Sequence, residues 1–583
     1  MSEDSIRTMI DIAVDAEPES LKSFSYGSGR FEIRPDGVFY VESDSERFIC
    51  SPLDVSAQTF DSSGNAWGRL LQWKDPADNI HKWAMPMALL SGDSCSEFRA
   101  ELMNSGLDIS PNKKERTLLA IYIQRFPTGR RARCVAKLGW HGNAYVLPTE
   151  TIGGDKDETV VFQNPHVLEP AFSVSGTKEE WRENVASLAA GNSRLTFAIS
   201  AGFAGPLLDV VNMEGGGFHL CGGSSKGKST AQILAASLWG DPARYKRSWR
   251  TTANALESLA LLSNDGLLIL DEIREISPKE IGAAIYMLAN GQSKSRANRS
   301  GLGLRVQTWK TLFLSSGEVA LSELMRQAGE RINTGQEIRF SEISIGDFED
   351  IHGYGTPGRF ADAVRNNAGR YYGAAGLEYL RQLVADRSGM IPAIREYIDS
   401  FVDSVVPEGA TGQIARVARR FGLVATAGEM ATHFGLTGWP IPAAREAAQT
   451  CFTVWVESFG GTGDRETREI LSQVRLFFEM HGSSRFSDVN EIDETRISNR
   501  AGFYRTDAFD GRQERTYYVL PEAFRYEVCK GLNFRTAIKT LINAGWIEQG
   551  NEKAAQKQRI PALQGKPTSV YVFNGKMWET ESC

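Results

Sequence analysis

The chain has 583 residues and a formal net charge of −7, with 42% hydrophobic and 23% charged residues. This balance is that of ordinary globular protein, and the length leaves room for roughly three or four domains. The acidic total opposes nucleic acid, so any such contact has to come from local basic patches.

Cysteine usage and the distribution of apolar residues indicate the compartment in which the protein works. Its 7 cysteines are scattered without a Cys-x-x-Cys pair, which favours a reducing compartment over a disulfide framework or a zinc ribbon. The acidic first residues lack an apolar core, and no apolar run reaches the length of about 18 residues that spans a membrane. We therefore expect a cytoplasmic protein without a signal peptide or membrane contact.

Strand-length segments dominate the first part of the chain. Strand-length segments at 31–34 and 37–41 are separated by turn residues, and a hairpin-like pattern follows at 133–148. One helix is predicted around 114–125. These elements predict an α+β N-terminal domain over residues 1–175.

A glycine-rich loop comes next. Helical spacing at 178–204 is followed by an apolar strand at 218–221 and by the pattern Gly-x-x-x-x-Gly-Lys-[Ser/Thr], the phosphate-binding loop of nucleoside triphosphatases. Glycines let backbone N–H groups turn inward around phosphates, and the following helix start adds its positive dipole end. The predicted nucleotide-binding residues are Gly222, Gly223, Ser224, Ser225, Lys226, Gly227, Lys228, Ser229 and Thr230.

Two residues of this loop have specific predicted roles. Lys228 reaches the β- and γ-phosphate oxygens, and the Ser229 hydroxyl binds Mg²⁺. The strand–loop–helix setting favours this interpretation over a glycine turn without a ligand. ATP and Mg²⁺ are therefore the predicted cofactors.

A second nucleotide motif is the apolar strand 267–270, which ends in Asp271 and Glu272. In a Walker B strand the first carboxylate supports Mg²⁺, directly or through water, and the second polarises the attacking water. An isolated Asp-Glu pair is more typical of structural capping, but its place after the phosphate loop favours catalysis. We predict Asp271 as a metal ligand, and Glu272 and Lys228 as catalytic residues.

A third apolar strand, 311–314, is followed by Ser315 and Ser316. In ring-forming AAA+ ATPases a polar sensor residue at this place lies between the Walker B strand and the γ-phosphate. Ser316 or Ser315 is predicted to act in this way by hydrogen bonding, and a simple strand-end turn is the alternative.

Ring-forming members also need an arginine from the neighbouring subunit to meet the transition-state charge. Arg326, Arg331 and Arg339 follow the sensor strand. We favour Arg331 and Arg339, just before or at the start of the next strand, while ordinary surface arginines are the alternative.

Residues 281–317 contain no acidic side chain, although the protein is acidic overall. Their glycines indicate a β-hairpin or an exposed loop. In a ring such a hairpin points into the central channel, where cations track the phosphate backbone of single-stranded DNA. The predicted contacts are Lys294, Arg296, Arg299 and Arg305, and a solvated positive face or contacts to nucleotide or a neighbouring subunit are the alternatives.

Helical spacing dominates residues 355–455, as in the lid that follows an AAA+ core, and Arg416, Arg419 and Arg420 sit where a helix can present a cation to the phosphates. Packing or solvent contacts explain these arginines equally well. After a glycine-rich linker the order helix, strand, basic loop and strand is that of a winged helix, which binds either DNA or protein. The later predicted domains are a P-loop ATPase core at 176–354, a helical lid at 355–460 and a winged-helix-like domain at 461–583.

Six short motifs occur in one order along the chain. They are Gly222-Gly-Ser-Ser-Lys-Gly-Lys-Ser-Thr, Ser248-Trp-Arg-Thr-Thr, Leu270-Asp-Glu, Tyr286-Met-Leu-Ala-Asn-Gly-Gln-Ser-Lys-Ser-Arg, Leu314-Ser-Ser-Gly-Glu and Gly335-Gln-Glu-Ile-Arg. As a set they resemble domain-of-unknown-function family 927 of phage, plasmid and satellite genes, over nearly the whole chain.

The resemblance implies a helicase-like, superfamily 3-like P-loop ATPase with an AAA+-type α/β core. It implies Lys228, Ser229, Asp271 and Glu272 as the ATP site, and the segment 294–305 as a candidate DNA element. Family members are often fused to a primase-like domain. We see no primase or Toprim-type carboxylate cluster here, so priming would need a separate partner.

We therefore predict an ATP-driven DNA helicase or translocase that forms a homo-oligomeric, hexameric ring and serves replication of a mobile element. The alternative is an ATP-switched scaffold or effector of a phage-satellite or defence system, which the acidic balance favours. Salt-sensitive binding of single-stranded DNA separates the two hypotheses.

Overall fold

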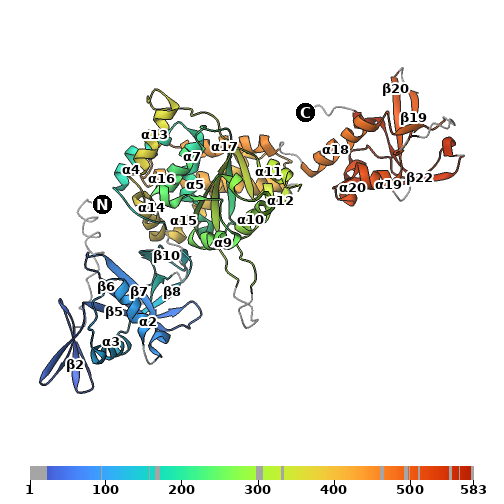
Figure 1. The fold of residues 1–583 in the computed structure, drawn as a ribbon. Helices are drawn as coiled ribbons and strands as arrows, with labels where there is room; N and C mark the ends of the chain where they lie inside the picture. Colours follow the sequence, from blue (N-terminus) through green and yellow to red (C-terminus); the bar gives the residue numbers. More distant parts are fainter. Residues whose placement is uncertain are drawn as a thin grey trace. The chain divides into compact units, whose positions relative to one another are not determined.

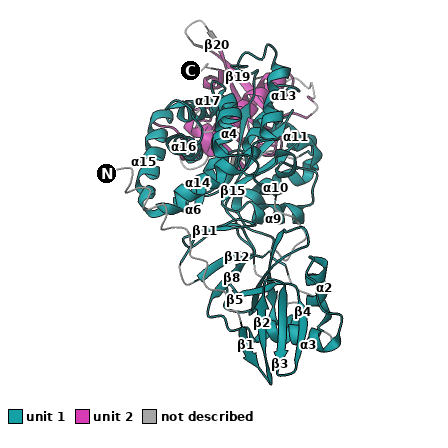
Figure 2. Ribbon diagram, turned by 90° about the vertical axis from the view of Figure 1, so that its left-hand side faces the viewer, with its two compact units in different colours: residues 1–406, 415–458 teal, residues 407–414, 459–583 magenta. Residues whose placement is uncertain are grey.

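The computed structural model describes residues 23–92, 95–155, 158–163, 171–296, 306–329, 334–459, 465–490, 497, 499–509, 512–550, 554–563 and 565–578. The chain divides into two compact units, residues 1–406 with 415–458 and residues 407–414 with 459–583 (Figures 1 and 2). The finer division into four domains stays a prediction. No helix in the described ranges has the length and apolar character needed to cross a membrane.

The N-terminal part of the first unit is built mainly from strands. Four of them form an antiparallel meander: β1 (Ser23–Tyr26), β2 (Gly29–Arg34), β3 (Gly37–Glu42) and β4 (Ser45–Cys50). A mixed sheet has the order β12-β8-β5-β6-β7, with β5 (Leu53–Asp61), β6 (Gly68–Lys74), β7 (Ile80–Pro86), β8 (Arg131–Val135) and β12 (Glu158–Phe162). Helices α2 (Ser96–Asn104) and α3 (Lys113–Arg125) share its core through the fully buried Phe98 and Tyr122.

A small antiparallel sheet connects this part to the rest of the unit. It contains β9 (Gly139–His141), β10 (Ala144–Val146) and β11 (Thr151–Gly153). The Trp140 indole donates to the carbonyl oxygen of Pro206 at 2.9 Å, and the Tyr145 hydroxyl donates to that of Asp265 at 2.7 Å. These buried contacts anchor the sheet to the residue before α6 (Leu207–Val210) and to the turn that precedes β15 (Gly266–Asp271).

The centre of the unit is an all-parallel sheet of order β14-β15-β16-β13-β17. Its strands are β13 (Gly216–Cys221), β14 (Arg247–Ser248), β15 (Gly266–Asp271), β16 (Thr311–Gly317) and β17 (Phe340–Ser344). The long strands are nearly continuous apolar runs, because a parallel sheet is covered on both faces. The sensor strand β16 thus lies between the phosphate-loop strand β13 and the Walker B strand β15.

Helices cover both faces of this sheet (Figure 1). On one face lie α5 (Ser193–Ala204) and α7 (Lys228–Ser237), where Phe197 packs against Phe218. On the other face α9 (Ala253–Leu262) and α10 (Pro278–Asn290) enclose an apolar cluster with Trp249, Leu268 and Phe313. Shorter helices are α4 (Lys178–Asn184), α6 (Leu207–Val210), α8 (Pro242–Tyr245), α11 (Leu321–Gln327) and α12 (Thr334–Glu337).

Five consecutive helices come between β17 and the second unit's α18 (Arg465–His481) in the described chain. They are α13 (Pro357–Ala368), α14 (Ala374–Ala385), α15 (Arg387–Val405), α16 (Gly412–His433) and α17 (Ala443–Phe459). Helix α13 packs against α7, and Phe421 of α16 packs against Phe197 and Phe218. These helices therefore bury the face of the sheet on which the phosphate-loop helix lies.

The second unit has its own sheet and core. Its elements are α18 (Arg465–His481), β18 (Phe486–Asp488), β19 (Gly502–Phe509), β20 (Arg512–Val519), α19 (Pro521–Ala523), α20 (Phe534–Asn543), β21 (Gln556–Arg559) and β22 (Pro567–Phe573). The sheet order is β18-β19-β20-β22-β21, and Phe478, Phe524 and Phe573 form the centre of the core. No strand was predicted from the sequence at the hairpin β19–β20.

Candidate functional site

The phosphate loop joins the end of β13 to the start of α7. Ser225 and Gly227 have φ angles of 62° and 92°, in the left-handed region that favours glycine. A Cβ atom on Gly227 would lie 2.7 Å from the Phe348 ring, so this position requires glycine for space as well as for conformation. Gly227 is the N-cap of α7 and supplies no side-chain cap, which leaves the first N–H groups of the helix to an anionic ligand.

Lys228 and Ser229 open this helix. Lys228 is 8% exposed, and its Nζ donates to the carbonyl oxygens of Gly222 and Gly223, both at 2.7 Å. The ammonium is thus folded over the loop itself. The Ser229 side chain is exposed beside it. The structure therefore brings the predicted phosphate ligand and the predicted metal ligand together at one helix start.

Asp271 is the last residue of β15, and its carboxylate has two partners, a hydroxyl and an ammonium group. Its Oδ1 accepts a hydrogen bond from Ser316 Oγ at 2.6 Å, and its Oδ2 accepts one from Lys246 Nζ at 2.5 Å. Burial raises the pKa of Asp271, but the hydrogen bonds from Lys246 and Ser316 outweigh burial and hold the pKa below its usual value. Asp271 is accordingly an ionised carboxylate at neutral pH, as a metal ligand must be.

Glu272 follows in a strained backbone conformation, with φ 53° and ψ 84°. Such left-handed angles are uncommon for a residue with a side chain and are concentrated at functional sites. Its N–H donates to Ser316 Oγ at 3.2 Å, so one hydroxyl contacts both Walker B residues. The half-buried carboxylate accepts a hydrogen bond from the N–H of Arg274 at 3.3 Å.

The two serines of β16 point to opposite faces of the sheet, as neighbours in a strand must. Ser315 is fully buried, and its Oγ accepts from Trp249 Nε1 at 2.9 Å and lies 3.0 Å from His219 Nδ1. Burial lowers the pKa of His219 to about 4, so the ring is neutral and donates from Nε2 to the carbonyl oxygen of Val319. Of the two predicted sensors, Ser316 is therefore the one beside the carboxylates, and Ser315 belongs to the core.

The donor set suits Mg²⁺. Among the described residues no group of three or more His, Cys, Asp or Glu side chains forms a metal site. Mg²⁺ needs no such cage, because it is usually held by one or two carboxylates, water and the phosphates of its substrate. The ionised Asp271 and the exposed Ser229 hydroxyl fit that mode of binding.

Arg339 lies where the parallel strands begin, at the edge of the sheet opposite to the one that carries the phosphate loop. It precedes β17, whose first residue pairs with Gly217 near the start of β13, whereas the phosphate loop follows the end of β13. Its Nε donates to Asn290 Oδ1 at 3.0 Å and its Nη1 to the carbonyl oxygen of Gly335 at 3.0 Å, with the guanidinium 5.3 Å from the Tyr286 ring centre. Arg339 is thus remote from the loop of its own chain. Arg331 lies outside the described residues.

The structure describes the two ends of the basic segment, up to residue 296 and from residue 306 onward. Gln292 pairs with Thr308, and Ser293 N–H donates to the carbonyl oxygen of Gln307 at 3.0 Å, so the segment begins and ends as an antiparallel pair. Lys294 is exposed. Arg296 is paired with the buried Glu257 at 2.7 Å, which neutralises part of its charge. The predicted contacts Arg299 and Arg305 lie outside the described residues.

The suggestion that arginines of α16 reach the phosphates is wrong. Arg420 is 5% exposed, and its Nη1 donates to the carbonyl oxygen of Ile338 at 3.0 Å, next to the start of β17. Burial lowers the pKa of Arg420 to about 10. Arg416 pairs with Glu214 and Arg419 with Asp399 of α15, so each of the three is engaged by a partner outside the phosphate loop.

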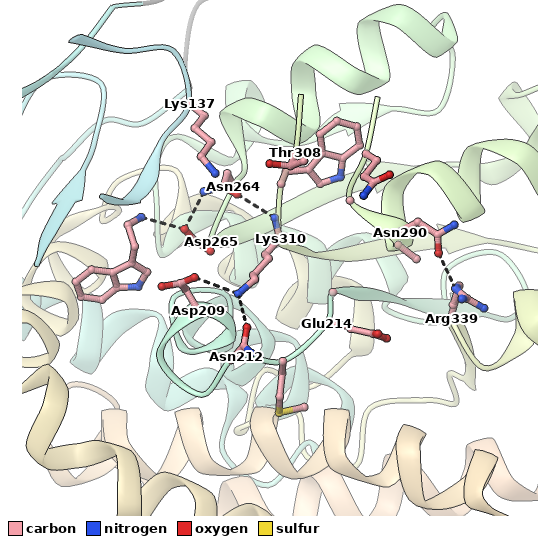
Figure 3. A pocket seen from close by; sticks show the side chains of 17 residues that line it. Lys137, Asp209, Asn212, Glu214, Asn264, Asp265, Asn290, Thr308, Lys310 and Arg339 are labelled. Atoms are coloured by element: carbon pink, nitrogen blue, oxygen red, sulfur yellow. Dashed lines mark hydrogen bonds and ion pairs between the residues drawn. The ribbon is translucent and has the colours of Figure 1, made fainter. Parts of the chain in front are cut away.

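A cavity of about 710 Å³ is also remote from the loop. Lys310 Nζ donates there to Asp209 at 3.1 Å and to Asn212 at 3.0 Å, and Figure 3 shows the three side chains together. Arg339 lines the same cavity, which therefore lies at the edge of the sheet where the parallel strands begin. A second cavity of about 230 Å³ adjoins the phosphate loop and is lined by Lys226, Arg194, Ile345 and Phe348.

Lys246 is the site residue that the sequence analysis missed. It follows α8, and it reaches Asp271 because the next residues form β14, the strand beside β15. Lys246 and Asp271 are close only because β14 and β15 are adjacent strands in the sheet. The only signal in the sequence was the position of Lys246 two residues before the Ser248-Trp-Arg-Thr-Thr motif.

Comparisons with known proteins agree with this architecture. The family described as "Domain of unknown function (DUF927)" matches residues 31–309. The solved structure named "SCCmec type IV Cch - active helicase" has a TM-score of 0.70 at 17% sequence identity, with 94% of this chain and 98% of that chain covered. This chain therefore shares the fold of that protein.

A second solved structure, the apo form of the NrS-1 C-terminal region, covers 66% of this chain and 92% of its own at 11% identity. Its TM-score of 0.24 is too low to indicate a shared fold. No curated protein matches the chain.

Proposed function

We propose that this protein is a Mg²⁺-dependent ATPase that drives translocation along DNA, and acts as a helicase in the replication of a mobile element. The observation that carries the proposal is the hydroxyl of Ser316, which bonds both Asp271 and the N–H of Glu272 one strand away from a phosphate loop. The fold shared with a protein named as an active helicase supports the same proposal.

The phosphates of ATP would bind to the N–H groups of the loop and of the first turn of α7. Lys228 would exchange the carbonyl oxygens of Gly222 and Gly223 for phosphate oxygens, which carry more negative charge. Ser229 and Asp271 would hold Mg²⁺, which supplies positive charge to the γ-phosphate. The nucleoside would lie in the cavity beside Lys226, Ile345 and Phe348.

Hydrolysis requires a water molecule in line with the γ-phosphate. Glu272 would position and polarise that water, because positioning and charge do most of the work in phosphoryl transfer. Ser316 would fix the backbone of Glu272 and the carboxylate of Asp271 relative to each other. Each of these residues therefore has a separate role in one small site.

Among the residues that the structure describes, no arginine has been assigned a role at the γ-phosphate. Arg339 lies at the opposite edge of the sheet, which supports a role in the site of a neighbouring copy. We therefore propose a closed ring of identical subunits, a hexamer, with Mg·ATP between subunits. Lys294, with its basic neighbours, would face single-stranded DNA in the channel, and the second unit would be a winged-helix-like module.

The test is ATP turnover with and without single-stranded DNA, with the mass of the assembly measured beside a non-hydrolysable ATP analogue. Stimulation of turnover by several-fold and a ring-sized mass are expected. Glu272→Gln keeps the size of the side chain but loses the carboxylate, and should lower turnover by about 10²- to 10⁴-fold while nucleotide binding persists. Turnover that is indifferent to DNA, in a monomer, would reject the motor.

An ATP-switched scaffold is the second candidate. The specific observation in its favour is the Arg296–Glu257 ion pair, which removes part of the positive charge from the predicted DNA segment. A scaffold needs nucleotide binding but no DNA affinity. Weak, salt-insensitive association with single-stranded DNA would therefore favour it over the motor.

A further inference from the structure

We propose that Lys246 is the counter-ion of Asp271 in the nucleotide-free protein, and that it keeps divalent cations out of the site until nucleotide arrives. The proposal rests on the proposed nucleotide site, and it assigns Lys246 a positioning role. Mg²⁺ would then enter together with ATP, and an empty subunit would not hold the metal alone.

The geometry places the ammonium where a cation would bind. Lys246 Nζ lies 2.5 Å from Asp271 Oδ2, and the two side chains are only 24% and 29% exposed. Helix α8, which ends just before Lys246, packs against the phosphate-loop helix α7, and the residues that follow Lys246 form β14 beside β15. The contact is therefore built into the site and is more protected from salt than an ion pair at the open surface.

The remaining oxygen of Asp271 is also engaged. Ser316 Oγ donates to Oδ1 at 2.6 Å, so neither oxygen is free of a partner. A divalent cation at Oδ2 would lie beside the ammonium, and the repulsion between the two charges would be strong in a partly buried site. Metal binding therefore requires Lys246 to move away from Asp271.

Nucleotide changes this balance. The phosphates of ATP bring negative charge to the loop, which attracts the metal and offers Lys246 another anionic partner. Exchange of partners then costs little, because each cation remains paired. Without nucleotide, displacement would leave Lys246 unpaired in a half-buried place, which is unfavourable.

The experiment is a titration of the nucleotide-free full chain with Mn²⁺, followed by electron paramagnetic resonance of the free ion. The variants are Lys246→Met, Lys246→Arg and Lys246→Met combined with Asp271→Asn. Lys310→Met is the matched control, because it removes the same charge from an ion pair at the other edge of the sheet. Circular dichroism establishes that each variant is folded.

Lys246→Met should bind Mn²⁺ about tenfold more tightly than the unaltered chain, a difference of about 1.4 kcal/mol. The gain should vanish in the double variant, while Lys246→Arg and Lys310→Met should bind Mn²⁺ like the unaltered chain. Equal Mn²⁺ affinity of Lys246→Met and the unaltered chain would overturn the proposal. So would a gain that survives Asp271→Asn, because the metal would then lie elsewhere.

This titration contains neither ATP nor DNA, so it is independent of turnover. A chain without DNA-stimulated ATP hydrolysis that still showed the expected Mn²⁺ affinities would reject the motor and keep the role of Lys246. A DNA-stimulated ATPase whose Mn²⁺ affinity ignored Lys246→Met would do the reverse.

Discussion

Ser316 Oγ donates a hydrogen bond to Asp271 Oδ1, with 2.6 Å between the two oxygen atoms, and so links the sensor strand to the end of the Walker B strand. The same oxygen accepts the N–H of Glu272, whose left-handed backbone needs a fixed partner. One hydroxyl thus determines where the proposed metal ligand and the proposed water-activating carboxylate lie relative to each other.

Ser316→Ala should therefore lower ATP turnover by about 10²-fold, because a displaced carboxylate loses its alignment with the phosphate. Turnover numbers measured at saturating Mg·ATP check this. Ser315→Ala is the matched control in the same strand. It leaves the indole N–H of Trp249 without its acceptor in the core, and should lower the free energy of unfolding by about 1–3 kcal/mol with a smaller effect on turnover. Equal turnover losses in the two variants would contradict the assignment.

A second prediction concerns the buried Asp265, whose carboxylate accepts the N–H of Trp140 at 2.9 Å and the amide of Asn264 at 2.7 Å. Burial raises the pKa of Asp265 to about 7, and nearby Asp209 adds to the rise, against the N–H of Trp140 and the charges of Lys137 and Lys310. The folded protein therefore holds a proton that the unfolded chain releases near pH 4. Stability should fall as pH rises from about 4 to about 7.

Asp265→Asn removes this proton but keeps an oxygen acceptor, and asparagine tolerates the left-handed φ of 50° at this position. The fall in the free energy of unfolding between pH 4 and 8 should shrink by about 2–4 kcal/mol. Urea unfolding across this range measures it. Asp362→Asn, at an exposed position on α13, is the control and should leave the profile unchanged. An unaltered profile in Asp265→Asn would show that Asp265 is ionised in the fold.

The sequence could predict the local structure of the motifs in the candidate site, a strand–loop–helix and a strand that ends in two carboxylates. The phosphate loop, Asp271 and Glu272 lie in short segments in which each strand, turn and helix is specified by adjacent residues. Lys246 and the division of labour between Ser315 and Ser316 depend on which strands are neighbours, and the sheet order is a property of the whole fold. Arg420 was misplaced for the same reason, since its spacing in a helix does not reveal which edge of the sheet the helix covers.

A third prediction separates the two described cations of the basic segment. Lys294 is exposed, whereas Arg296 is held by Glu257 and by Asn254, each at 2.7 Å. If both face single-stranded DNA, Lys294→Ala should lower the salt dependence of binding by about 0.7 in the slope of log K against log salt. Arg296→Ala should lower it less, because binding must first break its ion pair. Fluorescence anisotropy at several salt concentrations checks both slopes, and unchanged slopes would contradict the DNA contact.

The last prediction tests whether Arg339 acts on a neighbouring copy. The arginine and the phosphate loop lie at opposite edges of one parallel sheet, so a single chain cannot bring them together without breaking its core. Lys228→Ala destroys the loop of its own chain but keeps Arg339, and Arg339→Ala has the opposite defect. Each variant alone should be nearly inactive. In an equimolar mixture about a quarter of the interfaces in a head-to-tail ring would combine an intact loop with an intact arginine. ATP turnover of the mixture, after subunits have exchanged, should therefore rise well above that of either variant. A mixture with only the mean of the two activities would place the arginine outside the neighbour's site, and the contacts of Arg339 with Asn290, Gly335 and Tyr286 would then be its whole role.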